Sequence, residues 1–241
     1  SMVTCRSSTA AWQPGYVFEW KPDMRVLLIR HCKTKFNVSG HIMGWSDSPH
    51  VEDWLEDVQF IEHELAQRNL LPDLVYTSAL GRARHTGDYL AGQFGRTARH
   101  SQQLNEVDYG ELAEKPKKWV AANFPLHKVD PDFTYPGGES FSGMQSRAVA
   151  CLDGLAAAHP DETLLCVAHA GVIRGLVSHY LHLDFCDQLK RKIPHRYIGV
   201  LNLEHSICQA YEEWGDASGF VTERAITLPC HPHQADISAR L

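Results

Sequence analysis

Two short apolar runs in this chain each end in a histidine. Residues 26–29 lead into Arg30 and His31, and residues 163–168 lead into His169. Apolar runs of this length without polar alternation are typical of strands buried on both faces of a parallel sheet. Because the carboxyl ends of parallel strands share one sheet edge, where such folds bind ligands, we expect the two histidines to meet there.

Helical periodicity alternates with these strands. We expect a further strand at 74–77, helices at 53–68, 79–93, 139–158 and 172–181, and β segments at 200–203, 208–212 and 220–226 that form a hairpin at the sheet edge. Alternating strands and helices predict a three-layer α/β/α fold with a mostly parallel central sheet.

The domain organisation follows from the same pattern. We expect an N-terminal extension over residues 1–24, a single α/β domain over 25–228 and an irregular tail over 229–241. A stretch rich in proline and glycine interrupts the domain, with one helix near 117–124. We expect its residues 107–138 to act as a lid.

Composition excludes several classes of function. A formal net charge of −6 gives no positive field for nucleic acid, and no apolar run approaches the ~20 residues that cross a membrane. Seven scattered cysteines without paired spacing, and no secretory signal, favour a reduced cytoplasmic setting. Whether the chain forms a homodimer stays open.

Arg82 is a third candidate for the same sheet edge. It follows the strand at 74–77 and falls in the first turn of the next helix, where backbone N–H groups and the helix dipole favour an anion. Together with Arg30 it is placed to hold a phosphate. The alternative is a solvated helical arginine, which is our interpretation of Arg84.

Five sequence segments, in this order along the chain, carry a resemblance to a known family. They are residues 28–37 with 44–49, 78–86, 104–106 with Gly110, 136–140, and 168–174. This set resembles the signature of the histidine phosphatase superfamily, phosphoglycerate mutase-like branch, over residues 25–205.

The resemblance implies a role for each matching position. His31 is the expected nucleophile, transiently phosphorylated, and Glu106 is the expected proton donor to the leaving oxygen. The resemblance places Arg30, Arg82 and His169 around the phosphoryl group. The expected substrate-binding residues are Asn37, Thr34, Lys33 and Ala170. Fixed cationic donors suit the charge that phosphoryl transfer develops, and the mechanism requires neither metal nor cofactor.

Cys32 departs from the family pattern, which has glycine there. Its β-carbon is expected close to the phosphate loop, either narrowing the pocket or merely tolerated. Cys32 is also open to interpretation as a reactive thiol, although a small space-filling role is favoured. Pairs of histidines at 179 and 182 and at 231 and 233 are interpreted as surface residues rather than metal ligands.

The expected activity is metal-independent hydrolysis of a small phosphorylated metabolite, such as a sugar phosphate. The lid carries lysines but no paired arginines, which favours a phosphatase over a mutase of the phosphoglycerate type. A non-catalytic phosphate-binding relative and a metal-dependent phosphohydrolase are the remaining alternatives.

Overall fold

The computed structural model describes residues 24–217, 220–221 and 224–227. The strands are β1 (Met24–Arg30), β2 (Leu74–Ser78), β3 (Ala98–Ser101), β4 (Glu162–Ala168), β5 (Ile198–Glu204), β6 (Ile207–Trp214), β7 (Asp216–Ala217), β8 (Phe220–Val221) and β9 (Arg224–Thr227). The α-helices are α1 (Lys35–Ser39), α2 (Trp54–Gln67), α3 (Gly81–Gln93), α4 (Lys117–Asn123), α5 (Phe141–Ala158), α6 (Ala170–Tyr180) and α7 (Phe185–Lys190). Short 3-10 helices cover Gln102–Leu104, Gly110–Leu112 and Pro125–Lys128.

The main sheet has the strand order β3-β2-β4-β1-β5-β6-β9. The pairings β3 with β2, β2 with β4 and β4 with β1 are parallel, whereas β5, β6 and β9 are added by antiparallel pairings. Since β5 is antiparallel to both β1 and β6, strand β6 points the same way as β1. Five of the seven strands therefore share one direction, and the predicted mostly parallel sheet is confirmed.

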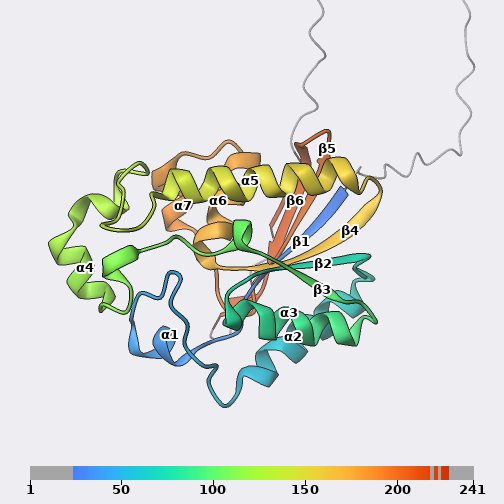
Figure 1. The fold of residues 1–241 in the computed structure, drawn as a ribbon. Coiled ribbons are helices and arrows are strands. Elements are labelled where there is room, and N and C mark those ends of the chain that lie inside the picture. Colours follow the sequence, from blue (N-terminus) through green and yellow to red (C-terminus); the bar gives the residue numbers. More distant parts are fainter. Residues whose placement is uncertain (1–23, 218–219, 222–223, 228–241) are drawn as a thin grey trace, which may run out of the picture.

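Helices cover both faces of this sheet (Figure 1). Helices α5 and α6 lie on one side and α2 and α3 on the other, with the strands between them. Strand β1 shows why both faces are covered: Val26 and Leu28 pack in the cluster that includes α5 and α6, whereas Leu27 and Ile29 pack in the cluster that includes α2 and α3. Successive side chains of a strand point to opposite faces, so this apolar run requires two apolar layers.

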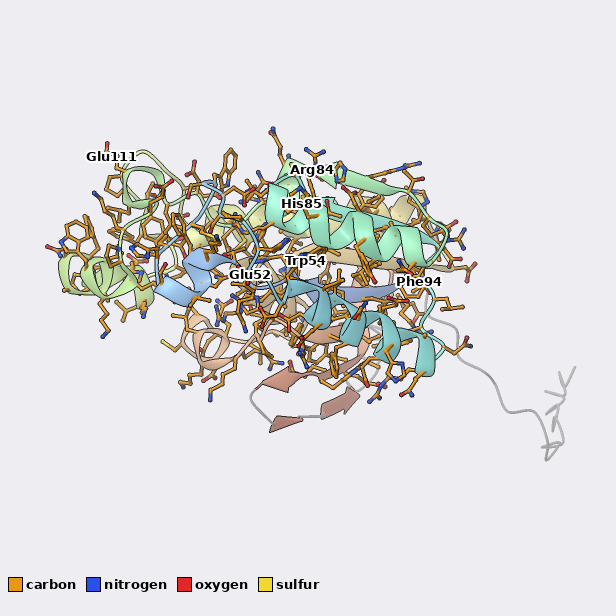
Figure 2. All side chains as sticks on the ribbon, turned by 90° about the horizontal axis from the view of Figure 1, so that it is seen from below. Glu52, Trp54, Arg84, His85, Phe94 and Glu111 are labelled. Atoms are coloured by element: carbon orange, nitrogen blue, oxygen red, sulfur yellow. The ribbon has the colours of Figure 1, made fainter. Side chains whose placement is uncertain are left out.

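Figure 2 looks at the face covered by α2 and α3. On α3, Arg84 lies exposed on the outer side of the helix, as expected, whereas Arg82 two residues earlier is buried. The two arginines of one helical turn therefore have opposite environments. At the start of α2, the side chain of Trp54 stacks on His50 with ring centroids 5.0 Å apart.

Most expected elements are confirmed within a few residues. No periodicity in the sequence predicts β3, α1 or α7, because these elements are short and lack a full amphipathic period. The expected segment at 220–226 divides into β8 and β9, and β8 pairs with β7 in a separate two-stranded sheet. The β5–β6 hairpin is not outermost in the main sheet, because β9 adds beyond β6.

Apart from Met24 in β1, the expected extension and tail lie outside the described residues. The expectation of one domain over 25–228 stays a prediction. No helix within the described ranges is long and apolar enough to cross a membrane.

The 107–138 segment is tied to the rest of the fold by backbone contacts at a close approach. Gly110 has φ +50°, and a Cβ there would stand 2.2 Å from the carbonyl oxygen of Pro136. The backbone N–H of Glu111 donates to that same carbonyl over 2.9 Å. Only glycine meets both demands, so the start and end of the segment are held together here. Whether the segment moves as a lid stays a prediction.

Candidate active site

The two strand-end histidines lie side by side. Strands β1 and β4 are neighbours in register, with Arg30 opposite Ala168, so His31 and His169 emerge together from the sheet edge. Their ring centroids are 5.1 Å apart, and the two side chains are 2% and 0% exposed. The predicted meeting of the two histidines is confirmed.

The hydrogen bonds of His31 fix its tautomer. Its Nδ1 lies 2.7 Å from the backbone carbonyl oxygen of Cys32. A carbonyl only accepts, so Nδ1 carries the proton and donates it. The Nε2 of a ring that lines the cavity is consequently left with a free electron pair. This is the state that a nitrogen nucleophile requires.

His169 is held by two consecutive hydrogen bonds that run through Ser78 at the end of β2. Ser78 donates its hydroxyl proton to Asn105 Oδ1 over 2.9 Å, so its oxygen accepts from His169 Nε2 over 2.8 Å. Among the described residues the other ring nitrogen, Nδ1, is buried without a hydrogen-bond partner. Because Nε2 carries the proton, this Nδ1 has a free electron pair, and it donates to an anion only when the imidazole takes up a second proton.

Arg82 is almost fully buried and is braced by the loop before it. It donates to the carbonyl oxygens of Ser46 and Gly44, each over 2.8 Å, and forms a salt bridge of 3.2 Å with Asp47. Its Nε has no partner within the described part of the chain, and the same holds for the Nε of Arg30. Each arginine of the pair thus retains an unused buried donor at the site.

These neighbours shift the acid–base behaviour of the site. Burial, followed by Arg82, His169, Arg30 and His195, lowers the pKa of His31 well below its ordinary value. Burial and then Arg82 and Arg30 lower the pKa of His169 in the same direction. Burial lowers the pKa of Arg30 only to about 10, so this guanidinium stays charged at neutral pH. The site therefore combines neutral imidazoles with charged arginines.

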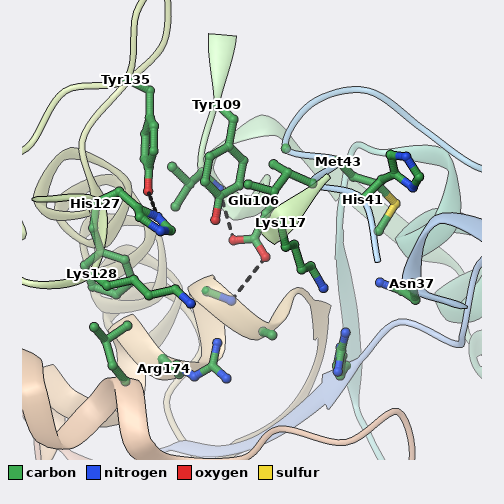
Figure 3. Close-up of a pocket in the computed structure, with 18 of the residues that line it drawn as sticks. Asn37, His41, Met43, Glu106, Tyr109, Lys117, His127, Lys128, Tyr135 and Arg174 are labelled. Atoms are coloured by element: carbon green, nitrogen blue, oxygen red, sulfur yellow. Dashed lines mark hydrogen bonds between the residues drawn. The ribbon is translucent and has the colours of Figure 1, made fainter. Parts of the chain in front are cut away.

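The carboxyl group of Glu106 lies beside the first turn of α6 (Figure 3). Its two carboxyl oxygens accept the backbone N–H groups of Val107 over 3.0 Å and Gly171 over 3.1 Å. A Cβ at Gly171 would stand 2.2 Å from Glu106 Oε1, so this approach depends on glycine. From α5, Arg147 donates to the carbonyl oxygen of Glu106 over 2.9 Å and fixes its backbone.

These groups adjoin a cavity of about 390 Å³. His31, Arg30, Arg82 and Glu106 line it, whereas His169 is not among its lining residues. Its wall also includes Arg174 of α6 and, from the 107–138 segment, the side chains of Lys117, His127, Lys128, Tyr109 and Tyr135. Figure 3 shows Lys117, Lys128 and Arg174 reaching toward the same space. The cavity wall is therefore mainly cationic.

The predicted substrate-binding residues divide into two groups. Asn37 and Ala170 line the cavity, whereas Lys33 and Thr34 are not among its lining residues. Thr34 is fully buried and caps α1, since its hydroxyl oxygen accepts the backbone N–H of Asn37 over 3.3 Å while its own backbone N–H donates to Asn37 Oδ1 over 3.1 Å. This capping uses the amide oxygen of Asn37 and leaves its NH2 group as a donor for the cavity.

Cys32 does not narrow the cavity. Its side chain is 0% exposed and packs with residues of α2 and α3 on the other side of the sheet edge. Burial raises the pKa of the Cys32 thiol to about 12, so it stays protonated at neutral pH. These observations favour the space-filling role over the reactive thiol.

No group of three or more His, Cys, Asp or Glu side chains in the described ranges is arranged to hold a metal ion. His179 and His182 belong to this part of the chain, whereas His231 and His233 lie outside it.

Arg174 and His195 are among the residues of the site that sequence reasoning missed. Arg174 stands four residues after Ala170, hence on the same face of α6, and this spacing was a usable signal. His195 donates from Nδ1 to the backbone carbonyl of His31 over 3.0 Å, and the two rings lie 5.6 Å apart. Nothing in the local sequence points to His195, because 164 positions separate it from its partner.

The fold and these groups together define a class: an α/β protein with a histidine pair and two arginines around an anion pocket at the carboxyl edge of its parallel strands. A sequence profile of the histidine phosphatase superfamily (branch 1) matches residues 26–216. The chain belongs to this superfamily, as its sequence blocks predict.

Named relatives fall on both sides of the mutase and phosphatase division. A 2,3-bisphosphoglycerate-dependent phosphoglycerate mutase of Beijerinckia indica is 29% identical over 165 residues, covering 64% of this chain and 80% of the mutase. Among solved structures, Bacillus stearothermophilus YhfR has a TM-score of 0.71 at 21% identity, covering 83% of this chain and 98% of that one. A phosphoserine phosphatase of Entamoeba histolytica has a TM-score of 0.68 at 19% identity, with coverages of 76% and 93%. These two structures establish the shared fold.

Proposed function

We propose that the protein hydrolyses a small phosphomonoester through a phosphohistidine intermediate on His31. The observation that carries the proposal is the state of His31: its Nδ1 is committed to the carbonyl oxygen of Cys32, which leaves Nε2 as the basic nitrogen. Beside it, the Nε atoms of Arg30 and Arg82 are buried and have no partner in the described part of the chain. Two unsatisfied guanidinium donors beside a nucleophile suit the oxygens of a phosphoryl group.

In the first step, Nε2 of His31 forms a bond to phosphorus while the ester P–O bond breaks. Glu106 gives its proton to the departing oxygen. In the second step a water oxygen attacks phosphorus, Glu106 takes a proton from that water, and the P–N bond breaks to release inorganic phosphate. Arg30 and Arg82 balance the charge on the equatorial oxygens in both steps.

We further propose that the substrate carries a second acidic group. Support comes from Arg174, Lys117 and Lys128, which are cationic side chains lining the cavity in addition to Arg30 and Arg82. The relatives named above act on phosphoglycerate and phosphoserine by their descriptions, and both compounds carry a carboxylate beside the phosphate. Burial lowers the pKa of Lys117, and Arg30 and Arg174 add to this effect, whereas a bound anion would favour its charged form.

The second candidate is a mutase reaction, in which a hydroxyl of the bound sugar acid takes the place of water. It gains support from the 107–138 segment. Although this segment lacks paired arginines, it contributes Lys117, His127 and Lys128 to the cavity wall. Such groups would hold a phosphorylated acid in place between the two transfers.

The test measures phosphate release from a panel of phosphoglycerates, phosphoserine, sugar phosphates and nucleoside monophosphates, with chelator present throughout. Acid-labile phosphate on the protein is measured in the same samples by 31P NMR. His31→Ala is compared with His63→Ala, because His63 is an exposed histidine of α2 far from the cavity. Reaction in 18O-labelled water separates the candidates, since only hydrolysis places the label in phosphate.

We expect that phosphate is released in the presence of chelator and that the rate is unchanged in His63→Ala. In His31→Ala, both phosphate release and the phosphohistidine signal are expected to disappear. Rearranged phosphoglycerate without labelled phosphate would favour the mutase. Turnover retained by His31→Ala would overturn both candidates.

A further inference from the structure

A short segment between α7 and β5 forms hydrogen bonds with three residues of the site. We call residues 191–197 the strap. The carbonyl oxygen of Ile193 accepts from the guanidinium of Arg30, and the carbonyl oxygen of Arg191 accepts from Arg174 Nε over 3.0 Å. The strap also supplies His195, whose Nδ1 donates to the backbone carbonyl of His31 over 3.0 Å.

These three contacts orient groups that face the cavity. Arg30, His31 and Arg174 all line it, and Figure 3 shows Arg174 reaching into it. A guanidinium whose Nε or Nη is committed to a fixed carbonyl loses rotational freedom, so the direction of its other donors follows the position of that carbonyl. The backbone of the strap therefore sets where both arginines point.

The strap is anchored by a cluster of four side chains that does not touch the cavity. The carboxylate of Glu213 on β6 forms a salt bridge with Arg191 and accepts the hydroxyl of Tyr211 over 2.6 Å. Tyr197, at the end of the strap, bonds the hydroxyl of Tyr211 and lies 3.3 Å from Glu213. We call Arg191, Tyr197, Tyr211 and Glu213 the anchor cluster.

Burial makes this cluster stiff. Tyr197 and Tyr211 are 2% and 0% exposed, and the side chains of Arg191 and Glu213 retain only 13% and 15% of their exposure. An ion pair with little access to water has few alternative partners, and breaking it leaves a poorly solvated charge. A second bond holds the strap from the other side, since Arg196 Nε donates to Asp57 of α2 over 2.8 Å.

We propose that the anchor cluster positions the strap and thereby orients Arg30, Arg174 and His31 for anion binding. Glu213 and Tyr211 are positioning residues in this proposal, since they act on the site only through the strap. The proposal deepens the proposed function and rests on it for its consequence on turnover. Its direct readouts are the affinity for inorganic phosphate and the protonation of His31, neither of which requires a substrate.

The experiment compares Tyr211→Phe and Glu213→Gln with Tyr180→Phe. Tyr180 is a matched control because it is 3% exposed and its hydroxyl donates to a carboxylate, Asp153, over 2.8 Å, yet it bridges α5 and α6 without contacting the strap. Dissociation constants for inorganic phosphate are measured by calorimetry. The pKa of His31 is followed by NMR of labelled histidine rings, and thermal unfolding reports folding.

We expect both cluster variants to bind phosphate about tenfold more weakly, the effect of losing about 1.4 kcal/mol of alignment. The pKa of His31 is expected to rise toward its ordinary value as Arg30 and His195 lose their fixed places beside it. Tyr180→Phe is expected to lower the melting temperature to a similar degree while leaving both readouts unchanged.

The proposal is overturned if the folded cluster variants have the same phosphate affinity and the same His31 pKa as Tyr180→Phe. If Glu213→Gln does not fold, Tyr211→Phe alone decides the test. Failure of the proposed function has a different signature. In that case no phosphohistidine forms on the unaltered protein, while the pKa of His31 still responds to the cluster variants.

Discussion

Glu106 Oε2 accepts the backbone N–H of Gly171 over 3.1 Å, and this bond sets the carboxyl in the wall of the cavity at the start of α6. The approach is so close that a β-carbon on Gly171 would lie 2.2 Å from the other carboxyl oxygen. The catalytic proposal for Glu106 therefore depends on the absence of a side chain at Gly171.

Gly171→Ala is expected to push the Glu106 carboxyl away from the departing oxygen. Because a positioned general acid contributes about 10²- to 10⁴-fold, we expect kcat to fall by at least about tenfold. Phosphate affinity should change little, since Arg30 and Arg82 are untouched. Steady-state kinetics and phosphate calorimetry measure the two effects. The matched control is Gly154→Ala on α5, where an added β-carbon meets nothing within 4 Å. Unchanged kcat in Gly171→Ala would contradict the role given to Glu106.

Arg147→Lys tests the support behind the same acid. Arg147 pairs with both oxygens of Glu139, over 3.1 Å and 2.6 Å, while also donating to the carbonyl oxygens of Gln103 and Glu106. Lysine keeps the charge but not the planar fork. We expect the free energy of unfolding to drop by about 1–3 kcal/mol, since this pair is only partly exposed. We also expect a lower kcat, because the backbone of Glu106 loses its brace. Urea unfolding and kinetics measure these effects, and an unchanged unfolding midpoint is the contrary result.

Lys117→Gln tests whether the substrate has a second acidic group. The neighbouring Lys118 is exposed and is not among the lining residues, so Lys118→Gln is the matched control. We expect Lys117→Gln to raise KM about tenfold for a phosphorylated acid, the scale of one charge-assisted hydrogen bond. KM for p-nitrophenyl phosphate, which has a single acidic group, should stay the same. Equal changes for both substrates would mean that Lys117 serves the phosphate itself.

The buried histidines predict that stability depends on pH. Burial, followed by Arg30, lowers the pKa of His195 to about 3, so below pH 6.5 the unfolded chain binds a proton there that the folded protein refuses. Stability is therefore full above about pH 7 and falls as pH decreases toward 3. Each such histidine adds a slope of up to about 1.4 kcal/mol per pH unit.

The variant His195→Asn isolates this contribution, because its amide N–H replaces Nδ1–H without titrating. Urea unfolding at pH 7, 6 and 5 should show a shallower decline than in the unaltered protein, by up to about 1.4 kcal/mol per pH unit. His63→Ala, which changes an exposed histidine, should leave the decline as it is. If stability falls equally with decreasing pH in all three proteins, the contribution assigned to His195 is refuted.

Cys32 is expected to resist alkylation. Its side chain is fully buried and its pKa is raised to about 12 by burial, whereas Cys186 on α7 is exposed. During brief treatment with iodoacetamide at pH 8, mass spectrometry of peptides should find Cys186 modified and Cys32 unmodified. Unfolding in urea should make both react. Rapid modification of Cys32 in the folded protein would revive the reactive-thiol interpretation.

Much of the site was readable from the chain because its residues follow regular elements. His31 and His169 come directly after apolar runs, and Arg82 falls in the first turn of a helix that follows a strand. The periodicity of the buried side chains and the direction of the strands determine where such residues leave the sheet. The resemblance then supplied their roles, together with Asn37, Ala170 and Glu106.

Other parts were not readable. Thr34 stands in the same sequence block as His31, yet it caps α1 and is not among the lining residues. The basic wall of the 107–138 segment, including Lys128, follows no period that would predict which side chains turn inward. The segment lacks an extended amphipathic helix, so its side-chain directions depend on how it packs.

By itself, the sequence determined the longer strands and helices, the two apolar faces of the sheet and the meeting of the two histidines, because these depend on local periodicity and on the direction of the strands. Only the tertiary structure decided that Arg30 and Arg174 are held by carbonyl groups of the strap and that His195 stands behind His31. Those contacts join positions far apart in the chain, and a hydrogen bond over about 3 Å depends on the final packing of every element between its partners.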